Sequence, residues 1–337
     1  MESVSQAVLG AAIGEITIGD RIGRKALLWG AVVATLPDLD VLANPLIDDV
    51  AELSAHRNIT HSILFVAVAS PIIGWILNRI HAGRASKRRW IVFASMTLLT
   101  AILLDCFNVY GTQVFQPFSS YRIGFDSISI IDPLFTTPLL VGFLIAVFIG
   151  RNHRRRRTVA LVCLAVSSAY LLLTLAIKTH VTAVAERSLE QSGAQYTDFM
   201  TSPTIGNTVL WWVVYKSPDG THVGYYSLFD DRDAIDFIFV PSNIHLLEPI
   251  IDTRAVRQLL WFSDGYFTVT SEDGKLMFSD LRFGEIRTDA SQPPQYVFTW
   301  EVVPDRETGE VDIAVRRPDV DDLGLALNRL IQRAQGI

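Results

Sequence analysis

Long apolar runs alternate with short polar stretches over the first 180 residues of the chain. A helix needs about 20 apolar residues to cross about 30 Å of hydrocarbon, and five of the runs approach this length. A sixth run, at the start, is shorter and contains Glu15, so it can be a span, a tilted span or a re-entrant segment. We therefore predict an all-α polytopic membrane domain with five to six transmembrane helices, drawn from Val4–Gly19, Ala26–Ala43, Ser62–Leu77, Trp90–Phe107, Pro133–Gly150 and Val159–Ile177.

The pattern changes after residue 180, where apolar and polar residues alternate as they do in strands. The tetrapeptides SPDG and SEDG are hairpin-turn signals, and helical patterns cover Ile244–Trp261 and Asp321–Gln335. We expect residues 181–337 to form a soluble α+β domain with a mainly antiparallel sheet, after a transmembrane domain over residues 1–180. The expected strands are Thr208–Tyr215, His222–Leu228, Asp236–Val240, Tyr266–Thr270, Lys275–Phe278 and Tyr296–Val303.

The composition is typical of a membrane protein, because 50% of the 337 residues are hydrophobic and only 19% are charged. Basic residues gather at 21–25, 79–89 and 151–157, whereas the loops between these positions contain only Arg57 and Arg122. Since Lys and Arg are retained on the cytoplasmic side, we expect a multi-pass protein of a bacterial inner membrane with an extracytoplasmic C-terminal domain. The arginine cluster fits an anchor beside anionic lipid better than a nucleic-acid site, and no nucleic-acid partner is expected.

The stretch PDLDVLANPLIDDVAELSAHRNITHS, residues 37–62, places acids and histidines between apolar runs. Pro37 should break or kink the helix, so Asp38 and Asp40 are expected on irregular or extended chain. Residues two apart on extended chain face the same way. The two carboxylates are therefore expected to converge.

The histidines of this stretch suit different positions. His56 and His61 cannot share one helical face, because five residues correspond to about 140° around a helix. We expect His56 in a loop and His61 in the first turn of the next helix, with Asn58 or Thr60 as its N-cap. Asp105 ends another apolar run at the same surface, so it should join the cluster.

Charged groups at membrane depth cost about 3 kcal/mol or more each, so they are rarely kept without a partner, water or an ion. The two cysteines, Cys106 and Cys163, give neither a disulfide framework nor a thiolate zinc site. Oxygen and nitrogen ligands suit zinc, manganese or another divalent ion, and they do not choose among these. The alternative is that the acids are helix caps, with Arg57 as an ion-pair partner.

These segments resemble a family of bacterial inner-membrane proteins, the YdjM-like (LexA-binding) membrane-bound metal-dependent hydrolases. The family is distantly similar to zinc-dependent phospholipase C, which splits phosphoesters with zinc held by histidines and aspartates. The resemblance therefore implies metal-dependent hydrolysis. The matching segments, in chain order, are AVLGAAIGE, LPDLD, HRNITHS, LLDCFNVYGTQ, PFS and IIDPLFT.

Two positions depart from the family pattern. Gln6 stands where many relatives have histidine, and Ala101 stands where an HxxxD helix motif would place its histidine. The resemblance carries over to Asp38, Asp40, His56, His61 and Asp105, and with their neighbours we assign hypothetical roles to nine residues. These are Asp38, His61, Asp105 and Gln6 as metal ligands, Asp40 (as general base) and His56 as catalytic residues, and Arg57, Asn108 and Arg122 as substrate-binding residues.

The leading hypothesis is a membrane-bound hydrolase that uses a divalent ion, zinc or manganese, at an extracytoplasmic site. The expected partners are membrane lipid and a small-molecule or lipid-linked substrate, such as a phosphoester. Because alanine cannot ligate a metal, Ala101 favours the alternative of a catalytically degenerate scaffold or binding protein. We expect the C-terminal domain to act as a lid or substrate-selecting cap.

Overall fold

The structure is a computed structural model, and it describes residues 3–150, 152–286, 294–304, 310–318 and 323–336. The chain forms two compact units. Helix α7 (His153–Ser192) runs without a break from the first unit into the second. The first unit comprises Met1–Ala43 and Ala55–Leu175, and the second comprises Asn44–Ser54 and Ala176–Ile337.

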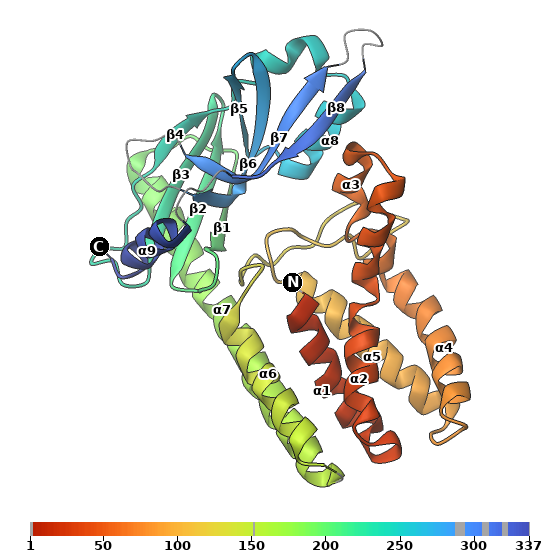
Figure 1. Cartoon of the computed structure of the whole chain (residues 1–337). Coiled ribbons are helices and arrows are strands. Elements are labelled where there is room, and N and C mark those ends of the chain that lie inside the picture. The colour runs from red at the N-terminus through yellow and green to blue at the C-terminus, as the bar shows by residue number, and fades with distance from the viewer. Residues whose placement is uncertain (1–2, 151, 287–293, 305–309, 319–322, 337) are drawn as a thin grey trace. The chain divides into compact units, whose positions relative to one another are not determined.

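The first unit is helical (Figure 1). Its elements are α1 (Ser3–Ile22), α2 (Lys25–Thr35), the 3-10 helices η1 (Pro37–Leu46) and η2 (Ile59–His61), α4 (Ile63–Ile80), α5 (Lys87–Asp105), α6 (Pro133–Phe148) and the first part of α7. Helix α1 lies against α2, α5 and α6, and α4 lies against α5. One apolar core surrounds Ile13 and Leu139, and a second surrounds Leu77 and Trp90.

Helices α1 and α2 approach most closely at glycines. A Cβ built on Gly10 would lie 2.2 Å from the carbonyl oxygen of Gly30, and one built on Gly30 would lie 2.0 Å from that of Gly10. Gly14 leaves room for the carbonyl oxygen of Ala26 in the same way, at 2.2 Å. Any larger side chain would push the two backbones apart, so these glycines are required by the packing.

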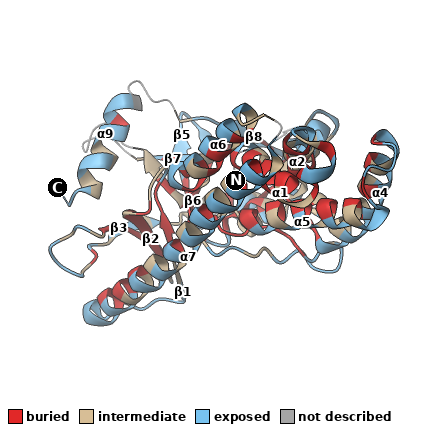
Figure 2. Cartoon of the chain, turned by 90° about the horizontal axis from the view of Figure 1, so that it is seen from below, coloured by how far each residue is buried: buried red, intermediate tan, exposed pale blue. Residues whose placement is uncertain are grey.

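The prediction of five to six transmembrane helices is wrong. Among the described residues, α4 and α7 are long and apolar enough to cross a membrane, and the bent pair of α2 and η1 makes a third span if it is counted as one. Helix α1 carries Gln6 and Glu15, α5 opens with three basic residues and ends at Asp105, and α6 has only 16 residues. Figure 2 shows that most of α1 is buried within the protein, whereas most of α4 is exposed or only partly buried.

The second unit is an α+β domain with antiparallel strands, as the alternation of residues predicts, but the strands form two four-stranded sheets and not one (Figure 1). The strand orders are β1-β2-β3-β4 and β5-β6-β7-β8, so each sheet follows the chain order. The elements are α3 (Asp49–Ala55), the second part of α7, β1 (Asp198–Pro203), β2 (Leu210–Ser217), β3 (Gly220–Ser227), β4 (Ile238–Pro241), the 3-10 helix η3 (Ile244–Ile250), α8 (Arg254–Ser263), β5 (Phe267–Glu272), β6 (Lys275–Ile286), β7 (Gln295–Pro304), β8 (Val311–Arg316) and α9 (Leu323–Ala334).

Alternate residues of β2 face two different cores. The indole N–H of Trp212 donates to the carbonyl oxygen of Leu281 at 2.7 Å, within a cluster that joins the two sheets. Trp211 packs with Val181 and Ala185, so the second part of α7 covers the other face of the first sheet. Both tryptophans are thus core residues of the sheet.

The two predicted hairpin turns are confirmed. SPDG links β2 to β3, and SEDG links β5 to β6, where Asp273 and Gly274 have φ angles of 51° and 79°. Strands β1 and β8 were not predicted. The predicted helix over 244–261 is in fact two helices, η3 and α8, because Pro249 cannot donate a helical hydrogen bond. The predicted helix start at Asp321 lies outside the described residues.

Candidate functional site

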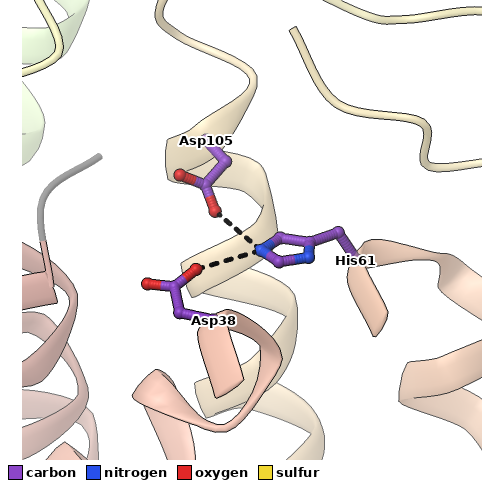
Figure 3. A group of neighbouring side chains, drawn as sticks. All are labelled: Asp38, His61 and Asp105. Carbon is purple, nitrogen blue, oxygen red and sulfur yellow. Dashed lines mark hydrogen bonds and ion pairs between the residues drawn. The ribbon is translucent and has the colours of Figure 1, made fainter. Parts of the chain in front are cut away.

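Three of the predicted metal ligands lie together in the first unit. His61 Nε2 is 3.1 Å from Oδ1 of Asp38 and 3.5 Å from Oδ2 of Asp105 (Figure 3). One ligand atom from each residue lies within 4.8 Å of the other two. His61 and Asp105 are buried, and Asp38 is partly exposed. These three residues can therefore hold a metal ion at a place that solvent reaches.

These side chains lie at or near the ends of three helices. Asp38 lies in the first turn of η1, His61 ends η2, and Asp105 ends α5. The prediction of irregular or extended chain after Pro37 is wrong, because proline is tolerated in the first turn of a helix and residues 37–46 form a 3-10 helix. The predicted N-cap of α4 is also wrong, since Ser62 accepts the backbone N–H three residues later at 3.0 Å.

Asp40 approaches His61 at its other ring nitrogen. The Thr60 hydroxyl donates to Asp40 at 3.1 Å and lies 3.0 Å from His61 Nδ1, which is 3.6 Å from the same Asp40 oxygen. Asp40 also accepts the backbone N–H of Arg57 at 3.2 Å, and its second oxygen is 3.0 Å from His56 Nδ1. A carboxylate beside the second nitrogen of a histidine fixes the orientation of the ring. Asp40 and the Thr60 hydroxyl thus occupy the Nδ1 side of His61, and Nε2 faces the two other acids.

Asp105 is bound by side chains from α1 and from the segment before η2. Gln6 Nε2 donates to Oδ2 at 2.8 Å, and an Arg57 nitrogen lies 3.3 Å from Oδ1. Arg57 also donates to Asn108 Oδ1 at 2.9 Å, and this oxygen accepts the backbone N–H of Tyr110 at 3.1 Å. With its oxygen used twice, Asn108 has only its Nδ2 donor left.

Three buried polar side-chain atoms around Asp105 have no hydrogen-bond partner among the described residues. They are Gln6 Oε1, Asn108 Nδ2 and Arg57 Nε, and the Gln6 and Asn108 residues are 0% exposed. Buried polar groups are almost always satisfied, so an orphaned oxygen on the amide that donates to Asp105 is compatible with a cation nearby. The oxygen and nitrogen donors suit zinc or manganese equally.

The remaining residues of the cluster differ in how well the sequence indicated them. Arg122 lies in the loop between α5 and α6, next to the bridge that pairs residues 112 and 123. Tyr110 was missed, although the Arg57 guanidinium lies 4.8 Å from the centre of its ring and the His56 ring lies 5.6 Å away. No spacing or charge marks a single tyrosine in such a loop, so only the fold reveals this contact.

Comparison with known proteins places the chain in a family. An uncharacterized protein of Bacillus subtilis (strain 168), YfhP, is 29% identical over 140 residues, which are 40% of this chain and 42% of that protein. The matched part thus spans less than half of this relative. No solved structure matches the chain. These matches include no phospholipase C, so that similarity stays a prediction.

The family description that matches is "YdjM inner membrane protein", and the match covers residues 1–181. This range includes every residue of the cluster around Asp38, His61 and Asp105. Because the match covers more than half of the 337 residues, the chain belongs to the YdjM inner membrane protein family.

Proposed function

We propose that the protein is a membrane-bound, metal-dependent hydrolase of phosphoesters, and that Asp38, His61 and Asp105 hold its ion. The observation that carries this proposal is the triangle of ligand atoms within 4.8 Å, one from each residue. Zinc or manganese bound there would polarise a phosphoryl oxygen and lower the pKa of a water molecule. Gln6 Oε1 is the proposed fourth protein ligand.

The surrounding side chains have proposed roles that follow from their contacts. Asp40 keeps His61 in the orientation that ligation needs, and its contact with His56 makes this carboxylate and imidazole a pair that can relay a proton. Asn108 Nδ2 is a buried donor suited to an oxygen of the substrate. Arg57, with Arg122 further along the α5–α6 loop, would favour an anionic substrate.

The proposal also puts the site at the extracytoplasmic face. His61 lies just before the first residue of α4, whereas Arg79 and the basic residues 84–89 lie at the other end of this candidate span. Lys and Arg gather on the cytoplasmic side, so the site end of α4 would face outward. Helix α7 begins in an arginine cluster, so by the same rule the domain that follows it is also extracytoplasmic.

The test is elemental analysis and enzymology on the detergent-purified full chain. Wild-type protein should contain stoichiometric zinc or manganese and hydrolyse bis(p-nitrophenyl) phosphate, and His61→Ala should lose both. His245→Ala is the matched control, because His245 is exposed in the second unit. Absence of metal from the wild type, or full activity of His61→Ala, would refute the proposal.

A non-catalytic scaffold is the second candidate, and one contact favours it. The buried Arg57 guanidinium already neutralises Asp105 across 3.3 Å, and Ala101, one turn earlier on α5, offers no ligand atom. The cluster would then be an ion-pair network that holds η1, η2 and α5 together. In that case chelators would leave the melting temperature unchanged, while His61→Ala would lower it.

A further inference from the structure

The loop between α5 and α6 carries a concentrated set of exposed aromatic rings. Phe115, Phe118 and Tyr121 are 46%, 85% and 70% exposed. The segment 115–121, FQPFSSY, has no acidic or basic residue. Single exposed apolar residues are common, but three rings within seven residues mark a surface that meets something less polar than water. We call residues 115–121 the aromatic run.

The segments that flank the aromatic run are fixed in place. Thr112 and Ile123 exchange two backbone hydrogen bonds of 2.9 Å, which close the loop at its base. The N–H groups of Phe125 and Ser127 donate to the carbonyl oxygens of Cys106 and Phe107 at 2.6 and 2.8 Å, just beyond the end of α5. The rings are therefore presented by a preformed loop, without an ordering cost.

One backbone contact fixes the aromatic run beside the end of a candidate membrane span. The N–H of Ile63, the first residue of α4, donates to the carbonyl oxygen of Val114 at 3.0 Å. The residue after Val114 is Phe115, so the run starts where α4 would leave the hydrocarbon. Tyrosine and other aromatic side chains favour this depth, because their rings prefer the apolar side and the hydroxyl prefers the headgroups.

A second backbone contact ties the same segment to the candidate metal site. The N–H of Gln113 donates to the carbonyl oxygen of Arg57 at 3.2 Å, and Arg57 pairs with Asp105. Exposed leucines also flank the site on η1, where Leu39 and Leu42 are 50% and 69% exposed. Apolar surface that can meet lipid thus lies on two of the segments that supply site residues.

We propose that the aromatic run inserts into the headgroup and upper acyl region of the bilayer, and that the site therefore acts on a membrane-embedded phosphoester lipid that reaches it from the bilayer. The substrate part rests on the proposed hydrolase function. The insertion part rests only on the exposure of the rings and on their contact with α4.

Depth measurement tests the insertion. Phe118→Cys, in a chain whose two native cysteines are replaced by alanine, is labelled with an environment-sensitive fluorophore. The protein is then reconstituted in vesicles of phosphatidylglycerol and acyl-brominated phosphatidylcholine. The label should shift to shorter wavelength and be quenched, whereas the same label at Asp219, in an exposed turn, should not. Equal quenching at the two positions would overturn the proposal, and Phe115→Cys serves if the first variant misfolds.

Hydrolysis tests the substrate. Phe118→Ser, with the native cysteines kept, should slow the hydrolysis of a fluorogenic phospholipid in vesicles and leave that of bis(p-nitrophenyl) phosphate unchanged. Equal slowing of the two, or a wild type that cleaves only the soluble ester, would overturn the lipid assignment. If the wild type cleaves neither ester, the proposed function fails together with the substrate part. The quenching result then still decides whether the loop is in the bilayer.

Discussion

A buried ion pair between α1 and α7 gives a quantitative prediction. Glu15 is 0% exposed, and its Oε1 lies 3.1 Å from Nε of Arg156, which is 1% exposed. The same oxygen lies 2.9 Å from Nδ1 of His153. The change Glu15→Gln keeps the shape of the side chain but leaves the Arg156 charge buried without its counter-ion. Losing one partner of a buried pair costs about 3–5 kcal/mol, so a loss of stability of this size is expected.

The same helix offers a matched control. Asp20 pairs with Arg89 at 2.5 Å, and both of these side chains are about one-third exposed, at 34% and 33%. Exposed pairs contribute about 0–1 kcal/mol, because water and salt already screen the charges. Asp20→Asn should therefore cost far less than Glu15→Gln, although both variants remove one negative charge from α1.

The assay is unfolding of the full chain in mixed micelles, followed by far-ultraviolet circular dichroism. The double variant Glu15→Met with Arg156→Met should recover most of the loss, since no unpaired charge is then buried. Equal costs for Glu15→Gln and Asp20→Asn would show that burial does not strengthen the inner pair. A double variant that is less stable than Glu15→Gln would show that the loss of stability comes from packing.

Three further predictions concern the metal and the second unit. Zinc at about 100 times its dissociation constant should stabilise the wild type by about 2.7 kcal/mol in thermal melts, and Asp38→Asn should show no such gain; an equal gain in both would place the ion elsewhere. Burial alone would raise the pKa of Asp230. Hydrogen bonds of 2.5 and 2.8 Å from Arg333 help to outweigh this effect, so the pKa of Asp230 lies below its ordinary value. The stability that this pair contributes is complete above the unfolded-state pKa of about 3.9 and is lost as the pH falls through the lower folded-state pKa. The melting temperature of Asp230→Asn should therefore fall less steeply with decreasing pH than that of the wild type. Gly274→Ala, at φ 79°, should cost roughly 1–2 kcal/mol in denaturant unfolding, whereas Gly274→Asn should cost less.

Hydropathy located the helices of the first unit but not their surroundings. The apolar run at the start of the chain predicts a helix, and α1 is one, yet residues such as Val8 and Ile13 pack against other helices instead of lipid. Sequence periodicity cannot distinguish these two apolar environments. Glu15 was the available sign that this run does not simply span the bilayer, and its partner, Arg156, is 141 residues further along the chain.

The three candidate ligands could be predicted from the sequence better than the contacts that hold them in place. The cost of charge near the membrane put Asp38, His61 and Asp105 in one cluster with Asp40 and His56, and the family resemblance named these three as ligands. Their supporting contacts depend on backbone geometry, such as the 3-10 turns that bring Asp40 to the second nitrogen of His61. In the second unit, the aromatic β2 was predicted, whereas β1 was missed because its sequence, DFMTSP, has little strand character.

The close contact of Gly10 with Gly30 has a consequence for the candidate metal site. Gln6 lies one helical turn before Gly10. The glycine contact fixes the position of α1 along its axis, and it therefore also fixes where the Gln6 amide meets Asp105. A slide of α1 by one turn, about 5.4 Å, would carry this amide out of reach. A bulkier residue at position 30, on a helix that supplies none of the three candidate ligands, would therefore displace the Gln6 amide from Asp105 without altering the candidate site itself.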